Sequence, residues 1–317
     1  MSYLEMLANQ FWHYHSKTFP EQADLFDRSR RDKLNESRPP VFTKAAAIHN
    51  VLVDGTLDRN GRNVVLTAIP VWERHRWFRS MRSSQALAQS VFGNLKAKRM
   101  SSVLHSVESE EGTRPFDFGD EEPSLELEKV AHDLGEAEGH ETKVDVYMKS
   151  GRRRLAIECK LTEATVGCCS RPKLDEADPY YCIGNYQRQA NRIANCSLTE
   201  VGILYWKFIP QVFLWNVETD HRPCPLRITY QLVRNVLAAS VAGDCTDCDQ
   251  AGAVLLYDSR NPEFSSGAGF EAYRQTRAAL RVPRQLCRVT WQNVVACMRH
   301  YPSLDSLTQQ LDLKYGL

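Results

Sequence analysis

The chain has 317 residues, of which 43% are hydrophobic and 25% charged, a balance typical of a globular protein. Its 40 Lys and Arg residues against 39 Asp and Glu give a formal net charge of +1. This charge excludes a strongly basic surface over the whole molecule, so a nucleic-acid-binding face would have to be a local patch. The sequence contains no run near the roughly 18 apolar residues that span a bilayer and no signal-peptide pattern at its start. We therefore expect a cytoplasmic protein, in which the ten cysteines are thiols or metal ligands rather than disulfides.

Residues 1–104 predict a mostly helical N-terminal region. Pro39-Pro40 ends whatever helix precedes it. Residues 63–71 predict a buried strand, and residues 83–95 predict a helix with Ser83 or Ser84 as its cap and Gly93 near its end. The segment 72–82 alternates arginines with aromatic residues, a pattern that suits either phosphate and base contacts or an amphipathic packing helix.

Residues 105–123 are acidic and rich in turn formers, which predicts an exposed loop. Downstream, the patterns predict a helix from Pro123 to Gly135, strands at 142–149 and 153–161, a polar helix at 185–195, apolar strands at 201–215, an amphipathic helix at 225–242 and a buried strand at 251–258. This order predicts an α/β fold with a mixed sheet flanked by helices. We expect a single domain over 1–317, with a core at 124–260 and a helical C-terminal region at 261–317.

The two strands around Ser150-Gly151 predict a β-hairpin with one apolar and one polar side. In the second strand, Leu155, Ile157, Cys159 and Leu161 form the apolar face and Arg154, Ala156, Glu158 and Lys160 the opposite one. If the hairpin is centred between Gly151 and Arg152, Asp145 stands opposite Glu158, with Cβ atoms about 5 Å apart. Lys160 follows two residues along the same face.

Two carboxylates at this separation suit a hard divalent cation such as Mg²⁺, which prefers a few carboxylates plus water and phosphate oxygens. Such an ion activates water and stabilises charge in phosphodiester hydrolysis, and a lysine beside it stabilises the developing negative charge. The alternative is a surface salt bridge between Lys160 and Glu158 or Asp145. The first interpretation predicts Asp145 and Glu158 as metal ligands, and Asp145, Glu158 and Lys160 as catalytic residues.

The residues Asp145, Glu158 and Lys160 resemble the motif of the PD-(D/E)xK nuclease superfamily, which has the restriction-endonuclease-like fold. Val144 stands where the motif's proline is usual. The resemblance covers roughly residues 124–260 and extends more loosely to uncharacterised bacterial members. It implies a Mg²⁺- or Mn²⁺-dependent endonuclease that acts on DNA, with a role in restriction or antiphage defence.

The resemblance also implies two further site positions. Members often add a glutamate from the helix before the first motif strand, for which Glu128 is preferred over Glu126. Many place a glutamine on the helix after the second strand, where Gln187 and Gln189 are the candidates.

Cysteines gather between the second motif strand and the amphipathic helix. Cys169, Cys182, Cys196 and Cys224 could ligate an iron–sulfur cluster, as in several nucleases of this fold, or a structural zinc. Their wide spacings match no standard motif, and scattered buried thiols are the alternative. Cys245 and Cys248 have C-x-x-C spacing without a second pair nearby, which favours a loop.

Two other functions remain open from the sequence. One is a nucleic-acid-binding protein that keeps the fold without catalysis, and the other is a cysteine-ligated iron–sulfur or zinc protein in which the hairpin charges are surface. The expected partner is DNA, and a second copy or a partner subunit is compatible with the pattern.

Overall fold

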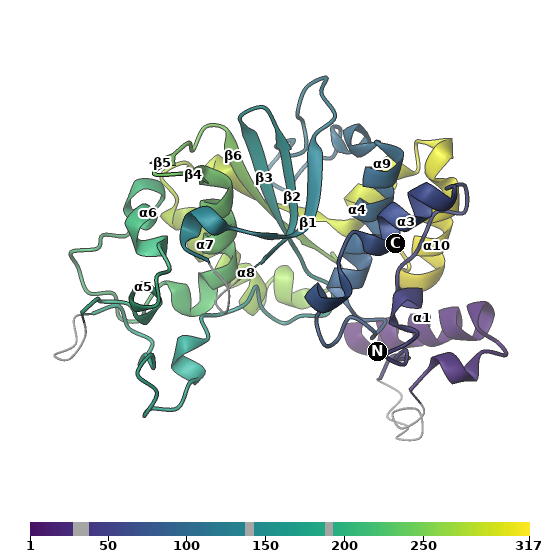
Figure 1. The fold of residues 1–317 in the computed structure, drawn as a ribbon, viewed down its shortest axis with the longest axis horizontal. Helices are drawn as coiled ribbons and strands as arrows, with labels where there is room; N and C mark the ends of the chain where they lie inside the picture. The colour runs from purple at the N-terminus through teal and green to yellow at the C-terminus, as the bar shows by residue number, and fades with distance from the viewer. Residues whose placement is uncertain (28–37, 137–142, 188–192) are drawn as a thin grey trace.

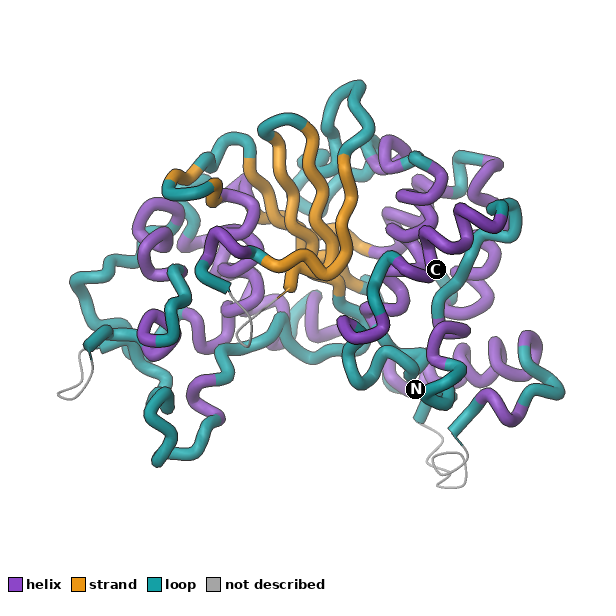
Figure 2. The backbone as a smooth tube through the Cα atoms, in the orientation of Figure 1, coloured by secondary structure: helices purple, strands orange, loops and turns teal. Residues whose placement is uncertain are grey.

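A five-stranded mixed sheet forms the centre of the computed structural model, which describes residues 1–27, 38–136, 143–187 and 193–317 (Figure 2). The strands are β1 Ser124–Val130, β2 Lys143–Ser150, β3 Arg153–Cys159, β6 Ala251–Tyr257 and β7 Leu286–Thr290. They lie in the order β1-β2-β3-β6-β7. The pairs β1–β2 and β2–β3 are antiparallel, and β3–β6 and β6–β7 are parallel. The expected α/β fold with a mixed sheet is confirmed.

Helices cover both faces of this sheet (Figure 1). Helix α7, Leu226–Ser240, packs against β3 and β6 on one face, and α4, Ser84–Lys98, packs against β1, β2 and β3 on the other. The other α-helices of the described residues are α1 Tyr3–Thr18, α3 Arg59–Thr67, α5 Ser197–Glu200, α6 Tyr205–Val212, α8 Ala268–Ala279, α9 Trp291–Met298 and α10 Asp305–Tyr315. The short strands β4 Val241–Ala242 and β5 Cys245–Thr246 form a separate two-stranded ribbon. The sheet thus separates two hydrophobic cores, one under α4 and one under α7.

The β2–β3 hairpin has the predicted register. Val146 pairs with Ile157 and Ser150 pairs with Arg153, so the turn is Gly151-Arg152, with Gly151 at φ 52°. The apolar side of β3 lies in the core under α4, while its polar side faces α7, where Arg154 donates to the carbonyls of Ser240 and Val241. The alternation along β3 is therefore confirmed, but its polar side is buried by a helix rather than exposed.

Helix α4 begins as predicted, because the Ser83 side chain caps it by accepting from the Ala86 N–H. It continues past Gly93 to Lys98 and ends at Arg99 in the left-handed conformation. Gly93 instead lets α3 approach closely, since a Cβ there would lie 3.3 Å from Val65 Cγ1.

The prediction of a strand at 63–71 is wrong. These residues belong largely to α3, whose N-terminus is capped by the Asp58 side chain accepting from the Gly61 N–H. Val65 is the buried residue of α3, against α4, so its apolar residues contribute one packing position rather than a strand face.

The prediction of a helix from Pro123 to Gly135 is also wrong, because Ser124–Val130 forms strand β1. Leu125 and Leu127 are buried and Glu126 is exposed, which is the period-two alternation of an edge strand. Pairing of Leu127 and Val130 with β2 overrode the helical spacing of Leu127, Val130 and Leu134, because this pairing was not visible in the local sequence.

Two further expectations failed after β3. Residues 201–215 contain helix α6 rather than strands, with its apolar side chains packed in the core under α7. The polar helix at 185–195 is absent from residues 185–187 and 193–195, and its middle lies outside the described residues. The helix at 225–242 and the strand at 251–258 are confirmed as α7 and β6.

Across the described ranges, none of the helices combines the length and apolarity needed to cross a membrane.

Candidate active site

The central sheet opens around Asp145. The β1–β2 ladder passes from Leu127↔Val146 to Lys129↔Val144 without pairing the residues between them, and the β2–β3 ladder stops at Val146↔Ile157. The Asp145 carboxylate enters this opening and its Oδ2 accepts the Cys159 backbone N–H at 2.7 Å. Asp145 thus replaces a missing ladder hydrogen bond and is fixed beside Glu158.

Glu128 reaches the same opening from β1. Its φ of 53° lies in the left-handed region, which is uncommon for a residue with a side chain and often marks a functional site. Gln85 on α4 holds the carboxylate, because its Nε2 donates to Glu128 Oε1 at 2.7 Å while its Oε1 accepts the His75 backbone N–H at 2.9 Å. Glu128 is therefore brought to the site by a strand rather than by the expected helix.

Helix α7 completes the site from the other side. Asn235 Nδ2 donates to Glu158 Oε2 at 2.7 Å, and Arg234 Nη2 approaches the same oxygen at 3.4 Å. Glu158 has an exposed fraction of 1%, so these partners compensate a buried carboxylate.

Lys160 lies between Glu158 and α7. Its Nζ is 2.7 Å from Glu158 Oε1 and donates to Gln231 Oε1 at 2.9 Å. Burial acts to lower the pKa of Lys160, but the carboxylates of Glu158, Glu163 and Asp145 outweigh burial and raise it. Lys160 is therefore a fixed positive charge and not a general base at neutral pH.

The carboxylates repel one another. Burial raises the pKa of Asp145 well above its usual range, and the charges of Glu158 and Glu128 raise it further. Burial likewise raises the pKa of Glu128 to about 7, with a further rise from Glu158 and an opposing effect of the Gln85 hydrogen bond. The site thus has an excess of buried negative charge around a small volume.

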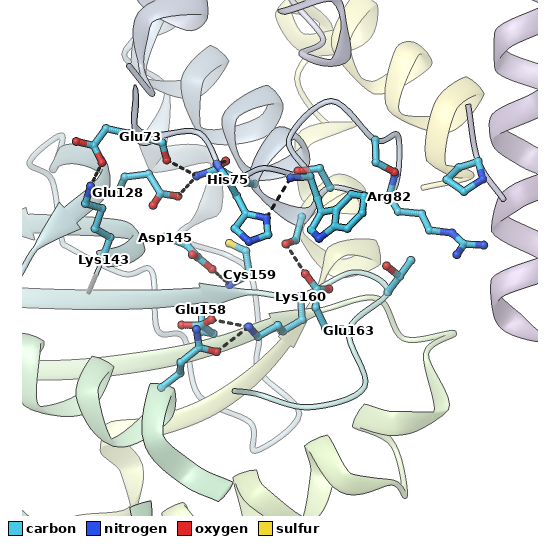
Figure 3. Close-up of a pocket in the computed structure, with 18 of the residues that line it drawn as sticks. Glu73, His75, Arg82, Glu128, Lys143, Asp145, Glu158, Cys159, Lys160 and Glu163 are labelled. Atoms are coloured by element: carbon cyan, nitrogen blue, oxygen red, sulfur yellow. Dashed lines mark hydrogen bonds and ion pairs between the residues drawn. The ribbon is translucent and has the colours of Figure 1, made fainter. Parts of the chain in front are cut away.

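These side chains line a cavity of ≈ 1290 Å³ (Figure 3). Glu128, Asp145, Glu158 and Lys160 all lie on its wall. The segment before α4 forms another part of the wall with His75, Trp77 and Arg82, so the basic and aromatic segment noted in the sequence runs along the site.

The structure separates the predicted site residues into two groups. Asp145, Glu158, Lys160 and Glu128 lie together, whereas Gln187 does not line this cavity and Gln189 lies outside the described residues. The glutamine that contacts Lys160 is Gln231 of α7. The sequence contained a signal for it, because Gln231, Arg234 and Asn235 fall three and four residues apart in a helix whose buried side is mostly apolar.

The predicted cysteines also meet in space. Cys169, Cys182, Cys196 and Cys224 line one small cavity beside the N-terminal end of α7. Cys245 and Cys248 lie at and after the β4–β5 ribbon, away from this cavity.

Carboxylate oxygens with an excess of negative charge are the donor set that fits Mg²⁺. Asp145 and Glu158 would hold the ion, with Glu128 next to them, and ion binding would offset the repulsion that raises the pKa values of Asp145 and Glu128. Among the described residues, no three His, Cys, Asp or Glu side chains are arranged to hold one metal ion by themselves. That finding is compatible with Mg²⁺ held by two carboxylates, water and phosphate.

A mixed sheet with helices on both faces is consistent with the restriction-endonuclease-like fold, and the opening between β1, β2 and β3 carries the acidic site. A family model described as "Restriction Endonuclease associating with ARP" matches residues 30–316. Because this match covers most of the chain, the protein belongs to that restriction endonuclease family. No curated protein and no solved structure gives a significant match to the chain.

Proposed function

We propose that this protein is a metal-dependent endonuclease that hydrolyses DNA phosphodiester bonds in restriction or antiphage defence. The observation that carries the proposal is the meeting of Asp145, Glu158 and Lys160 on one wall of a large cavity. Membership of a restriction endonuclease family supports a nucleic-acid substrate.

The chain's own residues have distinct roles in this proposal. Bound Mg²⁺ supplies an acidified water and stabilisation of phosphate charge. Asp145 and Glu158 hold their carboxylates in place through the Cys159 N–H and the Asn235 amide. Lys160 places a permanent positive charge where negative charge develops on the phosphate, and Gln231 orients it.

A partner is part of the proposal. The family description names an association with ARP, and a chain of net charge +1 has little overall attraction for DNA. We therefore expect a partner to strengthen DNA binding, measured as cleavage by the chain alone against cleavage by the chain purified together with that partner.

The deciding experiment measures cleavage of single- and double-stranded DNA and of RNA with Mg²⁺, Mn²⁺ or Ca²⁺. We expect DNA cleavage with Mg²⁺ or Mn²⁺, and a loss of about 100-fold or more in Asp145→Asn and Lys160→Met. Matched controls are Glu126→Gln, a carboxylate on β1 outside the cavity, and Lys149→Met, an exposed lysine of the same hairpin.

Two outcomes would contradict the proposal. Cleavage that persists in both site variants would place the chemistry elsewhere. DNA binding without cleavage under every metal and partner condition would make the chain a binding protein that has kept the fold.

A further inference from the structure

His75 lies on the wall of the acidic cavity, in the segment that precedes α4 (Figure 3). Gln85 connects it to Glu128, because Gln85 Oε1 accepts the His75 backbone N–H at 2.9 Å while Gln85 Nε2 donates to Glu128 at 2.7 Å. Glu163 also lines this cavity, and its charge acts on both His75 and Lys160. His75 thus belongs to the part of the wall that surrounds the carboxylates.

The chain on both sides of His75 is attached to the folded core. The Phe78 N–H donates to the His75 carbonyl at 2.8 Å, which closes a turn, and the Phe78 side chain is buried. Before the turn, Glu73 pairs with Lys143 of β2, and the Glu73 carbonyl accepts from Gln85 Nε2 at 3.3 Å. His75 is therefore held in place as a catalytic side chain on a loop needs to be.

One ring nitrogen of His75 is already occupied. Its Nδ1 accepts the backbone N–H of Trp77 at 3.3 Å, so the proton of the neutral ring lies on Nε2. A protonated ring would direct an Nδ1–H group at the Trp77 N–H, which disfavours the charged form. Burial lowers the pKa of His75, the charge of Arg76 lowers it further, and Glu163 acts in the opposite direction. At neutral pH His75 is therefore a neutral hydrogen-bond donor.

The other ring nitrogen of His75 is left for a ligand. Nε2 forms no hydrogen bond within the described ranges, and His75 is exposed on the cavity wall. A neutral donor suits this position, because an added positive charge would pair with the carboxylates and compete with a metal ion for them. Neutral imidazole donors stabilise negative charge that develops on a substrate oxygen in this way.

We propose that His75 is a further catalytic residue, which donates an Nε2 hydrogen bond to a non-bridging oxygen of the scissile phosphate. This inference rests on the proposed nuclease function. The hydrogen bond strengthens as negative charge develops on that oxygen, so it stabilises the transition state more than the bound substrate. No proton is transferred, and Lys160 supplies its positive charge separately from β3.

The test variant is His75→Asn. Asparagine Oδ1 accepts an N–H two residues along the chain, so it keeps the bond from Trp77, but its side chain is too short to replace Nε2. In a single-turnover assay with Mg²⁺ we expect DNA cleavage about 100-fold slower than in the wild-type chain. DNA affinity measured in Ca²⁺ should change less than about threefold, because the lost interaction belongs to the transition state.

His300→Asn is the matched control, because His300 is an exposed histidine that does not line the cavity. This variant should cleave at the wild-type rate. A histidine that serves only to close the turn would leave His75→Asn at the wild-type rate as well, and that result would overturn the proposal.

Phosphorothioate DNA tests the contact itself. Sulfur accepts a hydrogen bond more weakly than oxygen, so sulfur in place of the contacted oxygen at the cleavage position should slow the wild-type chain for one of the two stereoisomers. In His75→Asn this effect should be about tenfold smaller, because the contact is already lost. Equal effects of sulfur in both proteins, for both stereoisomers, would contradict the contact.

The tautomer of His75 gives a readout that does not depend on cleavage. In NMR spectra of the chain with ¹⁵N-labelled histidine, we expect the His75 proton on Nε2 near neutral pH, with the signal assigned from its absence in His75→Gln. This signal should shift when DNA binds in Ca²⁺. A proton on Nδ1, or a signal that DNA leaves unchanged, would overturn the proposal even if His75→Asn does not fold.

Asp145→Asn in the same cleavage assay separates this inference from the proposed function. Cleavage by the wild-type chain and by His75→Asn, but not by Asp145→Asn, would remove the role of His75 and leave the nuclease function in place. A wild-type chain that cleaves no nucleic acid would overturn both.

Discussion

At the scale of single residues, the site contains three neighbouring carboxylates whose mutual repulsion destabilises the folded chain. Glu128, Asp145 and Glu158 approach one another between α4 and α7, and Glu128 adopts a left-handed backbone in doing so. Neither feature stabilises the fold by itself. Both are typical of a site in which stability is lost in favour of function.

The destabilising effect of the Glu128 charge can be measured through the pH dependence of the free energy of unfolding. The pKa of Glu128 is about 7 in the folded chain and near 4.5 in the unfolded chain, so stability falls as pH rises between these values and stays lower above them. Without divalent ions, Glu128→Gln should therefore raise the free energy of unfolding by about 1–3 kcal/mol near pH 8 and change it little near pH 4.

Urea denaturation at both pH values tests this prediction. The control Glu126→Gln removes an exposed carboxylate of the same strand and should change the free energy of unfolding by less than about 0.5 kcal/mol. A Glu128→Gln protein that is less stable than wild type near pH 8 would show that the carboxylate is favourably bound in the folded chain.

At the scale of elements, helix α7 joins the core to the chemistry. Its apolar residues pack under β3 and β6, and Gln231, Arg234 and Asn235 project between them toward Lys160 and Glu158. The polar face of β3 is thereby buried with its charges paired. A buried carboxylate that loses a hydrogen-bond donor retains the full cost of burial.

Asn235→Leu should consequently lower the free energy of unfolding near neutral pH by about 2–4 kcal/mol. Urea denaturation measures this loss, and the slope of the free energy of unfolding against urea concentration should be the same as in the wild-type chain. Asn293→Leu on α9 is the matched control, because Asn293 is exposed and its loss should cost about 0.5 kcal/mol or less. Equal stability of the two variants would mean that Glu158 does not rely on Asn235.

At the scale of the whole molecule, the two end helices close the core under α4. Helices α1 and α10 pack against each other, on the side of the sheet covered by α4 (Figure 1). The rings of Phe11 and Tyr315 meet edge to face with centroids 5.7 Å apart. Tyr3 and Arg260 both bind Asp258 just after β6, which ties the N-terminal region to the sheet.

Leu311 on α10 tests this closure. It is fully buried in the core that includes β2 and β3, so Leu311→Ala should lower the free energy of unfolding by about 2–5 kcal/mol. Leu214→Ala is the control, since 60% of Leu214 is exposed and its truncation should have little effect. If both variants unfold at the same urea concentration, α10 is not part of the cooperative unit.

The sequence by itself determined the features that depend on short spacing. Alternation along the hairpin and the Ser150-Gly151 turn predicted the register that brings Asp145 toward Glu158, and a serine cap with apolar periodicity predicted α4. The helix and strand after the cysteine-rich connection followed from the same local rules.

Only the tertiary structure decided which distant residues join the site. Glu128 is on a strand because β1 pairs with β2, and Gln231 rather than Gln187 meets Lys160 because the connection folds aside and α7 crosses the sheet. The meeting of four widely spaced cysteines is likewise a result of chain folding. The spacing of apolar residues within a segment indicates which of its sides is buried. Contacts between segments depend on how the segments pack together, which the sequence of one segment does not determine.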